Sequence, residues 1–248
     1  MFSKKERCIY RNNQLGEVIC QIRFPEILSI GARMPVDFLE AIRHLFPHFS
    51  VNQEPSDKSG SDVNYCFATA DGVWQLNLTS QFLALSCKKY TGWEAFAKRL
   101  DVPLSVFIQL YKPAYFHRIG LRYINFISRD SLELSDTPFR ELFQPQYLGL
   151  MSDDTMDETK FTCCSCDVDT AIYNGCRVKI NAGPARVRPN GDDDGEIKFI
   201  FDLYLYMKGN IPVNHAAGAL ETIHAQSFPI YRGAITETLH NAMEPTPV

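Results

Sequence analysis

Two arginines on one predicted strand are the residues of this chain best placed to contact a ligand. Arg118 and Arg122 lie in the segment 115–125, YFHRIGLRYIN, which is typical of a long β-strand. Strand side chains alternate between faces, so both arginines and Gly120 share one face, with about 13 Å between the arginines. Since a planar guanidinium suits phosphate or carboxylate, the spacing predicts a groove for an anionic or aromatic partner, or a layer of internal ion pairs.

Acidic residues on other predicted strands offer partners for these arginines inside the protein. Asp202, Asp167 and Asp169 are all available, and the sequence favours internal pairing over free guanidinium groups. The functional interpretation therefore depends on whether the charges of Arg118 and Arg122 stay open to solvent.

The other face of the same strand carries His117, Tyr123 and Asn125. A histidine beside an arginine is suited to acid–base chemistry on a phosphodiester. A single strand histidine is more often structural, so His117 and Tyr123 are binding candidates and no catalytic residue is assigned.

A small basic zone lies further along the chain. Arg177, Lys179, Arg186 and Arg188 precede an acidic run at 192–196. With exposed aromatic side chains, for which the sequence offers Tyr173, Tyr204 and Tyr206, these residues would form a platform for single-stranded nucleic acid. The net charge of -4 and the pI of about 5.9 provide no overall field that attracts nucleic acid.

Cysteine-rich and acidic segments offer no convincing metal site. Cys163, Cys164 and Cys166 alternate across a predicted strand, so the three thiols do not converge as zinc requires, and we expect reduced core cysteines. The acidic runs lack the ligand spacing of a calcium loop. Phosphate-binding, dinucleotide-binding and nucleophile-elbow motifs are also missing. We therefore expect no cofactor and no metal, and a non-enzyme is favoured.

The sequence predicts a cytoplasmic protein. Its first residues, MFSKKERC, lack the apolar core of a signal peptide. The sequence also contains no run of about 18 apolar residues, the length that a membrane span needs.

The elements that would position these residues follow a repeated order. The first half is predicted as a strand at 17–24, a helix at 35–46, a polar loop at 52–62, strands at 65–70, 73–79 and 82–88, and a helix at 91–110. The second half is predicted as a strand at 115–127, a short helix after Pro138, and strands at 161–171, 176–182 and 197–207. A helical segment follows from Val213, Pro229 breaks it, and a second helix continues at 230–243. Asp71-Gly72 and Asn174-Gly175 predict tight hairpin turns.

This order predicts an α+β fold with two similar halves, 1–113 and 114–248, packed as one compact unit. Each half would have a curved antiparallel sheet backed by a long helix.

The strand RIGLRYIN at 118–125 resembles a sporadically distributed family of uncharacterised bacterial and archaeal proteins of about this length. The segments LGEVICQIRF at 15–24, WQL at 74–76 with FLAL at 82–85, and FPIYRGAIT at 228–236 resemble other parts of that family. The resemblance covers nearly the whole chain and implies no established activity. The family's scattered occurrence is typical of mobile or antiviral defence regions.

Two functions from different classes are predicted. The first is a non-catalytic interaction or regulatory module of a microbial cytosolic complex, with a protein partner. The second is an RNA-binding or RNA-processing protein that uses Arg118, Arg122, His117, Lys179 and Arg186 on a basic sheet face. A small-molecule cavity lined by the abundant aromatic side chains is a third alternative, although core packing explains those side chains more simply. The oligomeric state is not predicted.

Overall fold

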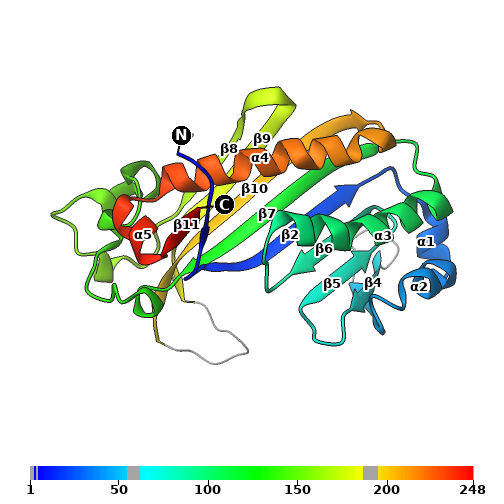
Figure 1. Ribbon diagram of the computed structural model, residues 1–248, viewed down its shortest axis with the longest axis horizontal. Coiled ribbons are helices and arrows are strands. Elements are labelled where there is room, and N and C mark those ends of the chain that lie inside the picture. Colours follow the sequence, from blue (N-terminus) through cyan, green and yellow to red (C-terminus); the bar gives the residue numbers. More distant parts are fainter. Residues whose placement is uncertain (1–2, 4, 55–61, 187–194, 248) are drawn as a thin grey trace. The chain divides into compact units, whose positions relative to one another are not determined.

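The computed structural model describes residues 3, 5–54, 62–186 and 195–247. Helices and antiparallel strand pairs alternate along the chain, which confirms the α+β class (Figure 1). The strands are β1 Cys8–Tyr10, β2 Leu15–Arg23, β3 His48–Glu54, β4 Asp62–Ala68, β5 Trp74–Leu78, β6 Phe82–Cys87, β7 Phe116–Ile127, β8 Cys166–Ala171, β9 Cys176–Arg186, β10 Ile197–Ile211 and β11 Pro245–Pro247. The α-helices are α1 Leu28–Ala32, α2 Val36–Ile42, α3 Trp93–Tyr111, α4 Ala216–Ala234 and α5 Glu237–Ala242.

The described strands form two sheets. One is the pair β1–β11, and the other has nine strands in the order β3-β4-β5-β6-β2-β7-β10-β9-β8. Short 3-10 turns occupy much of the segment between β7 and β8.

The chain divides into two compact units that interleave in sequence. The first comprises Met1–Gly16, Arg122–Leu205 and His224–Val248, and the second comprises Glu17–Leu121 and Tyr206–Ile223. The boundaries fall inside β2, β7, β10 and α4. The predicted boundary at 113–114 lies within the second unit.

The core of the second unit is aromatic. Phe96 and Phe107 of α3 are fully buried, and they pack on Trp74 of β5 and Phe24 with ring centroids 5.6 and 4.5 Å apart. This packing follows the apolar stripe of α3, which the sequence predicts from its helical spacing. Helix α3 packs beside strands β5 and β6 (Figure 1).

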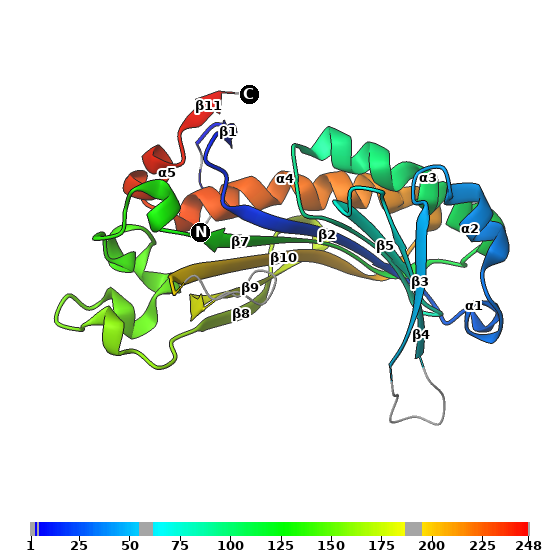
Figure 2. The same cartoon turned by 90° about the horizontal axis from the view of Figure 1, so that it is seen from below.

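The core of the first unit lies between α4 and the sheet. Phe199 and Phe201 of β10 are fully buried, and Phe143 stacks on Phe199 at 4.0 Å while Tyr231 of α4 meets Phe201 edge-on at 5.8 Å. Figure 2 shows α4 on one side of β7 and β10.

The helix prediction around Pro229 is wrong. Helix α4 runs without a break from Ala216 to Ala234, with Pro229 inside it. Proline removes one helical hydrogen bond, but burial of Ile230 and Ala234, which follow it in the helix, offsets that cost. The expected helix at 230–243 is replaced by α5, which starts after Thr236 because the threonine hydroxyl accepts a hydrogen bond from the Leu239 amide at 3.4 Å.

Strand β3 is missing from the predicted elements. It occupies His48–Glu54, where a polar loop from residue 52 was expected, and it pairs with β4 in antiparallel register. Part of the predicted loop, 55–61, lies outside the described residues. Strand β3 escapes prediction because Phe49 and Val51 are its only apolar residues, and their short alternation ends in a polar run from residue 52.

The two hairpin turns differ in structure. Asn174 and Gly175 both have positive φ, 55° and 73°, as the predicted turn requires. In the other turn only Gly72 has positive φ, and Asp71 instead accepts hydrogen bonds from the Thr69 hydroxyl at 2.5 Å and the Val73 amide at 3.0 Å. The predicted strand at 161–171 is shorter than expected, since β8 begins at Cys166.

Candidate functional site

The first unit presents one sheet face that is not buried against α4. Along β7, Leu121, Tyr123, Asn125 and Ile127 are buried, while Arg122 between them is exposed. Strand β10 repeats this alternation, with Phe201 and Leu203 buried and Asp202 and Tyr204 half-buried. We call the solvent-facing side the open face; it comprises Arg122, Asp167, Asp169, Arg177, Lys179, Asn181, Asp202 and Tyr204.

Arg122 is paired inside the molecule. Its Nε and Nη2 atoms donate to the two carboxylate oxygens of Asp202 at 2.8 and 2.5 Å, a two-bond geometry that fixes both side chains. The Arg122 side chain remains 46% exposed, whereas that of Asp202 is 14% exposed. The predicted ion pair with Asp202 is thus present, and it is neutral but open to solvent.

Strands β8 and β9 continue the pattern of paired charges. Arg177 donates to Asp169 at 2.8 Å, and the Asn181 amide donates to Asp167 at 2.8 Å. Lys179 is exposed and lies directly opposite Asp169 in the strand register. The described open face therefore holds three basic side chains, Arg122, Arg177 and Lys179, against three acidic ones, Asp167, Asp169 and Asp202.

Arg118 belongs to the second unit and has a different environment. Its guanidinium carbon lies 4.3 Å from the centroid of the Tyr206 ring, close enough for a cation–π interaction. Tyr206 is only 3% exposed, so it does not contribute an open stacking surface, contrary to the nucleic-acid platform considered from the sequence. Alternation of burial along β10 fails at this point, because Leu205 is buried as well.

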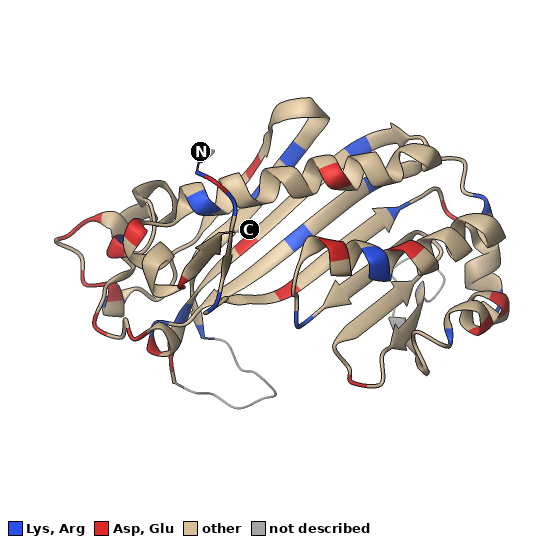
Figure 3. Cartoon of the chain, in the orientation of Figure 1, with Lys and Arg blue, Asp and Glu red and all other residues tan. Residues whose placement is uncertain are grey.

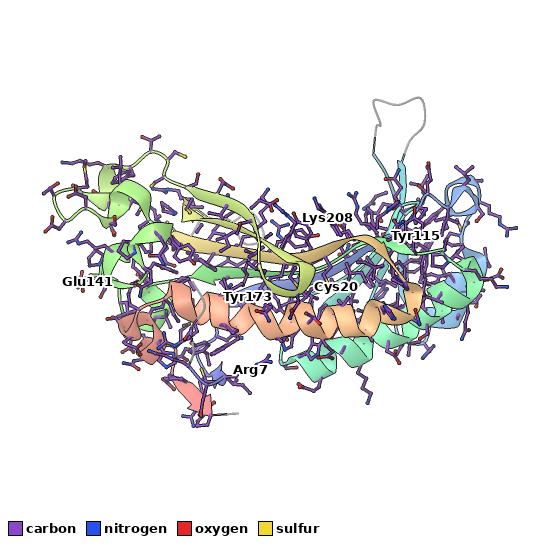
Figure 4. All side chains as sticks on the ribbon, turned by 90° about the horizontal axis from the view of Figure 1, so that it is seen from above. Arg7, Cys20, Tyr115, Glu141, Tyr173 and Lys208 are labelled. Carbon is purple, nitrogen blue, oxygen red and sulfur yellow. The ribbon has the colours of Figure 1, made fainter. Side chains whose placement is uncertain are left out.

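The remaining predicted residues are spread over different surroundings. His117 of the second unit is exposed and meets the Tyr115 ring edge-on at 5.2 Å. Tyr173 is 64% exposed at the β8–β9 turn (Figure 4). Arg186 is exposed at the end of β9, while Arg188 and the acidic residues 192–194 lie outside the described residues.

Tyr123 lies on the helix-covered face, not on an open one. Its hydroxyl oxygen is 2.9 Å from Nδ1 of His224 in α4, and both side chains are buried, at 7% and 4% exposed. Burial, with a smaller contribution from Arg7, lowers the pKa of His224 from 6.5 to about 4. His224 therefore stays neutral at pH 7, and the pair is a packing contact of the first unit.

The lowered pKa of His224 predicts how the stability of the protein changes with pH. His224 is protonated near pH 6.5 in the unfolded chain and near pH 4 in the folded chain. The free energy of unfolding therefore decreases as the pH is lowered from 6.5 to 4. We expect a loss of about 3 kcal/mol from this residue as the pH is lowered across that window. Urea unfolding at successive pH values would measure it.

The matched variant His224→Gln removes the titration while keeping an acceptor for Tyr123. Its stability should depend less on pH between 6.5 and 4 than that of the wild type, whereas His215→Gln, at an exposed position, should not change the dependence. Equal slopes for wild type and His224→Gln would contradict the assignment.

A second cluster of polar contacts surrounds the buried Arg232 of α4. Arg232 is 3% exposed, and its Nη2 donates to both carboxylate oxygens of Glu237 at 2.7 Å. Lys5 also pairs with Glu237, and the Tyr10 hydroxyl lies 2.9 Å from Nδ1 of His240. Burial, with Arg232 and Lys5 nearby, lowers the pKa of His240. These contacts hold β1 and α5 against α4, and the pairs that join the N-terminal segment to α5 gave no sequence signal because their partners are more than 200 residues apart.

The cysteines do not form a metal centre in the described part of the chain. All eight are free thiols, and within that part no three His, Cys, Asp or Glu side chains are grouped to hold a metal ion. The Cys164 thiol instead donates to the Leu148 carbonyl at 3.2 Å.

Charged residues of both signs are interspersed along the strands and helices, as Figure 3 shows. None of the helices in the described residues is both long enough and apolar enough to span a membrane. Comparison with protein-family models gives no match, and neither does comparison with curated proteins.

Proposed function

We propose that this chain is a non-catalytic interaction module whose open face binds a protein partner. The observation that supports this proposal is the balance of charge on that face, where each arginine is already paired with a carboxylate. Protein partners suit such a surface, because interfaces combine polar pairs with a few aromatic side chains, here Tyr204. The proposal keeps the cytoplasmic location expected from the sequence.

The same balance argues against the RNA alternative. Affinity for RNA comes largely from cationic side chains that replace the counterions of the phosphates, so an RNA surface needs an excess of positive charge. On the open face three acidic side chains offset the three basic ones, and the aromatic Tyr206 is buried. Lys179 and Tyr173 remain the residues through which RNA binding would act.

Reciprocal changes on the open face test the proposal. A tagged wild-type chain would be purified from its source cells, and its stoichiometric partner identified and then titrated by calorimetry. We expect Lys179→Glu to weaken this partner at least about tenfold, because it introduces a third carboxylate beside Asp167 and Asp169. Lys160→Glu, an 81% exposed position outside the face, is the matched control and should bind normally.

Two outcomes would overturn this function. One is a partner whose affinity is the same for wild type and Lys179→Glu. The other is binding of a short single-stranded RNA that weakens steeply with salt and is lost in Lys179→Glu and Arg122→Ala.

The family resemblance and the internal duplication are also proposed. The duplication is supported by element order, since in each half a central strand, β2 or β7, precedes a long helix, α3 or α4. The numbers of strands between them differ, four in the first half and three in the second. The family's defence association stays a prediction.

A further inference from the structure

Two strands end the nine-stranded sheet and leave backbone groups on one side without a neighbouring strand in the described sheet. These are β3 in the second unit and β8 in the first. Edge strands tend to pair with other chains unless charge, proline or a covering segment prevents it. The two edges of this protein differ in that protection.

Strand β8 is protected by charge. Asp167 and Asp169 are exposed on one face of this six-residue strand. Antiparallel pairing with a second β8 in a continuous sheet brings together residues of the same face. Any such register that pairs more than half of β8 sets an aspartate directly opposite an aspartate, which is destabilising.

Strand β3 lacks this protection. Its seven residues, HFSVNQE, contain no lysine, arginine, proline or aspartate. His48, Ser50, Val51 and Asn52 are exposed, so side chains on both faces of the strand reach solvent. Phe49 is half-buried, and its ring stacks on that of Tyr65 in β4 with the centroids 6.3 Å apart. This contact holds β3 against β4.

The sequence of β3 is also complementary to itself. An antiparallel pair of β3 strands uses all seven residues only when the twofold axis passes through Val51, and Pro47 prevents an extension at the N-terminal end. This register pairs His48 with Glu54, Phe49 with Gln53, Ser50 with Asn52, and Val51 with Val51 of the other copy. In this register no like charges stand opposite one another.

We propose that β3 pairs with β3 of a second copy of this chain, forming a twofold-symmetric dimer through sheet edges. A twofold contact of this kind is self-complementary, so each pair of residues occurs twice. The area of one strand pair is small, so the dimer is weak and its population rises with protein concentration. This proposal does not depend on the function proposed for the open face.

Sedimentation velocity over a wide range of protein concentration tests the dimer. The wild type should shift from monomer to dimer, whereas Val51→Lys should raise the dissociation constant at least about tenfold, because two lysines would meet on the twofold axis. Val51 is 39% exposed, so the substitution should leave the fold intact, which circular dichroism would verify. Val36→Lys, at a 53% exposed position of α2, is the control and should dimerise as the wild type does.

A charge exchange across the interface supplies a second, independent readout. His48→Glu would set two glutamates opposite Glu54 residues and weaken the dimer, and the double variant His48→Glu/Glu54→Lys should restore it. A wild type that stays monomeric at every concentration would overturn the proposal. So would a dimer that Val51→Lys leaves unchanged, or a double variant that remains as weak as His48→Glu.

Discussion

Glu158→Ala is expected to lower the free energy of unfolding by about 3 kcal/mol, since it removes one partner of a mostly buried ion pair. The side chains of Arg129 and Glu158 are only 18% and 15% exposed, and Nη1 of Arg129 donates to Glu158 Oε1 at 2.5 Å. The second carboxylate oxygen accepts the Phe139 amide at 2.8 Å. The guanidinium carbon also lies 4.1 Å from the centroid of the Phe139 ring. Alanine would leave both the guanidinium and a backbone amide without this acceptor.

Urea unfolding at constant m-value measures this loss, and two further variants separate its causes. Glu158→Gln keeps one acceptor oxygen and should lose less than Glu158→Ala. Lys160→Ala removes one partner of an exposed pair with Asp157 and should change stability by at most about 0.5 kcal/mol. The interpretation fails if Glu158→Ala is as stable as Lys160→Ala.

Gly183→Ala should have a comparably large effect, for a steric reason. A Cβ atom at Gly183 of β9 would lie 2.4 Å from the Cys164 carbonyl oxygen and 3.2 Å from the Ser165 Cα atom. Both are backbone atoms, and the hydrogen bond from the Cys164 thiol to the Leu148 carbonyl restrains this segment further. We expect a loss of about 2–3 kcal/mol, with displacement of β8 and its two aspartates from the open face.

Gly218→Ala provides a control of opposite sign. Apart from its chain neighbours and the backbone of α4, no described residue has an atom within 4 Å of a Cβ built at Gly218, so alanine should stabilise the protein by about 0.5–1 kcal/mol through its helix propensity. Thermal unfolding of the two variants gives the comparison directly. Equal shifts of the midpoint for Gly183→Ala and Gly218→Ala would rule out the close backbone contact as the cause.

Local patterns in the sequence predict most of the regular elements but not the irregular ones. Asn174-Gly175 gives its turn because both residues tolerate positive φ, and the apolar stripe at helical spacing gives α3. Strand β3 offers only a short pattern, since Phe49 and Val51 are its two apolar residues and the rest of the strand is polar. Pro229 predicts a helix break that does not occur, since α4 continues through it. Burial around α4 offsets the lost hydrogen bond, and the neighbouring sequence does not reveal this burial.

The sequence predicts which residues belong to the candidate site, but not how they pair. The sequence names Asp202, with Asp167 and Asp169, as a possible internal partner of Arg118 and Arg122, because these acids lie on other predicted strands. It cannot give the registers that join Arg177 to Asp169 or place Lys179 opposite Asp169, and these registers decide the charge of the face. His224 was missed because its contact with Tyr123 spans 101 residues of chain.

The interleaving of the two units has a consequence for synthesis of the chain on the ribosome. The second unit needs residues 206–223, and the first needs residues 224–248 in addition to its earlier segments. Neither unit is complete while the nascent chain is shorter than this, so final folding waits until residues 206–248, about a sixth of the given sequence, have left the ribosome. Premature termination anywhere before residue 206 would therefore leave both units with exposed apolar surface, as a substrate for chaperones and proteases.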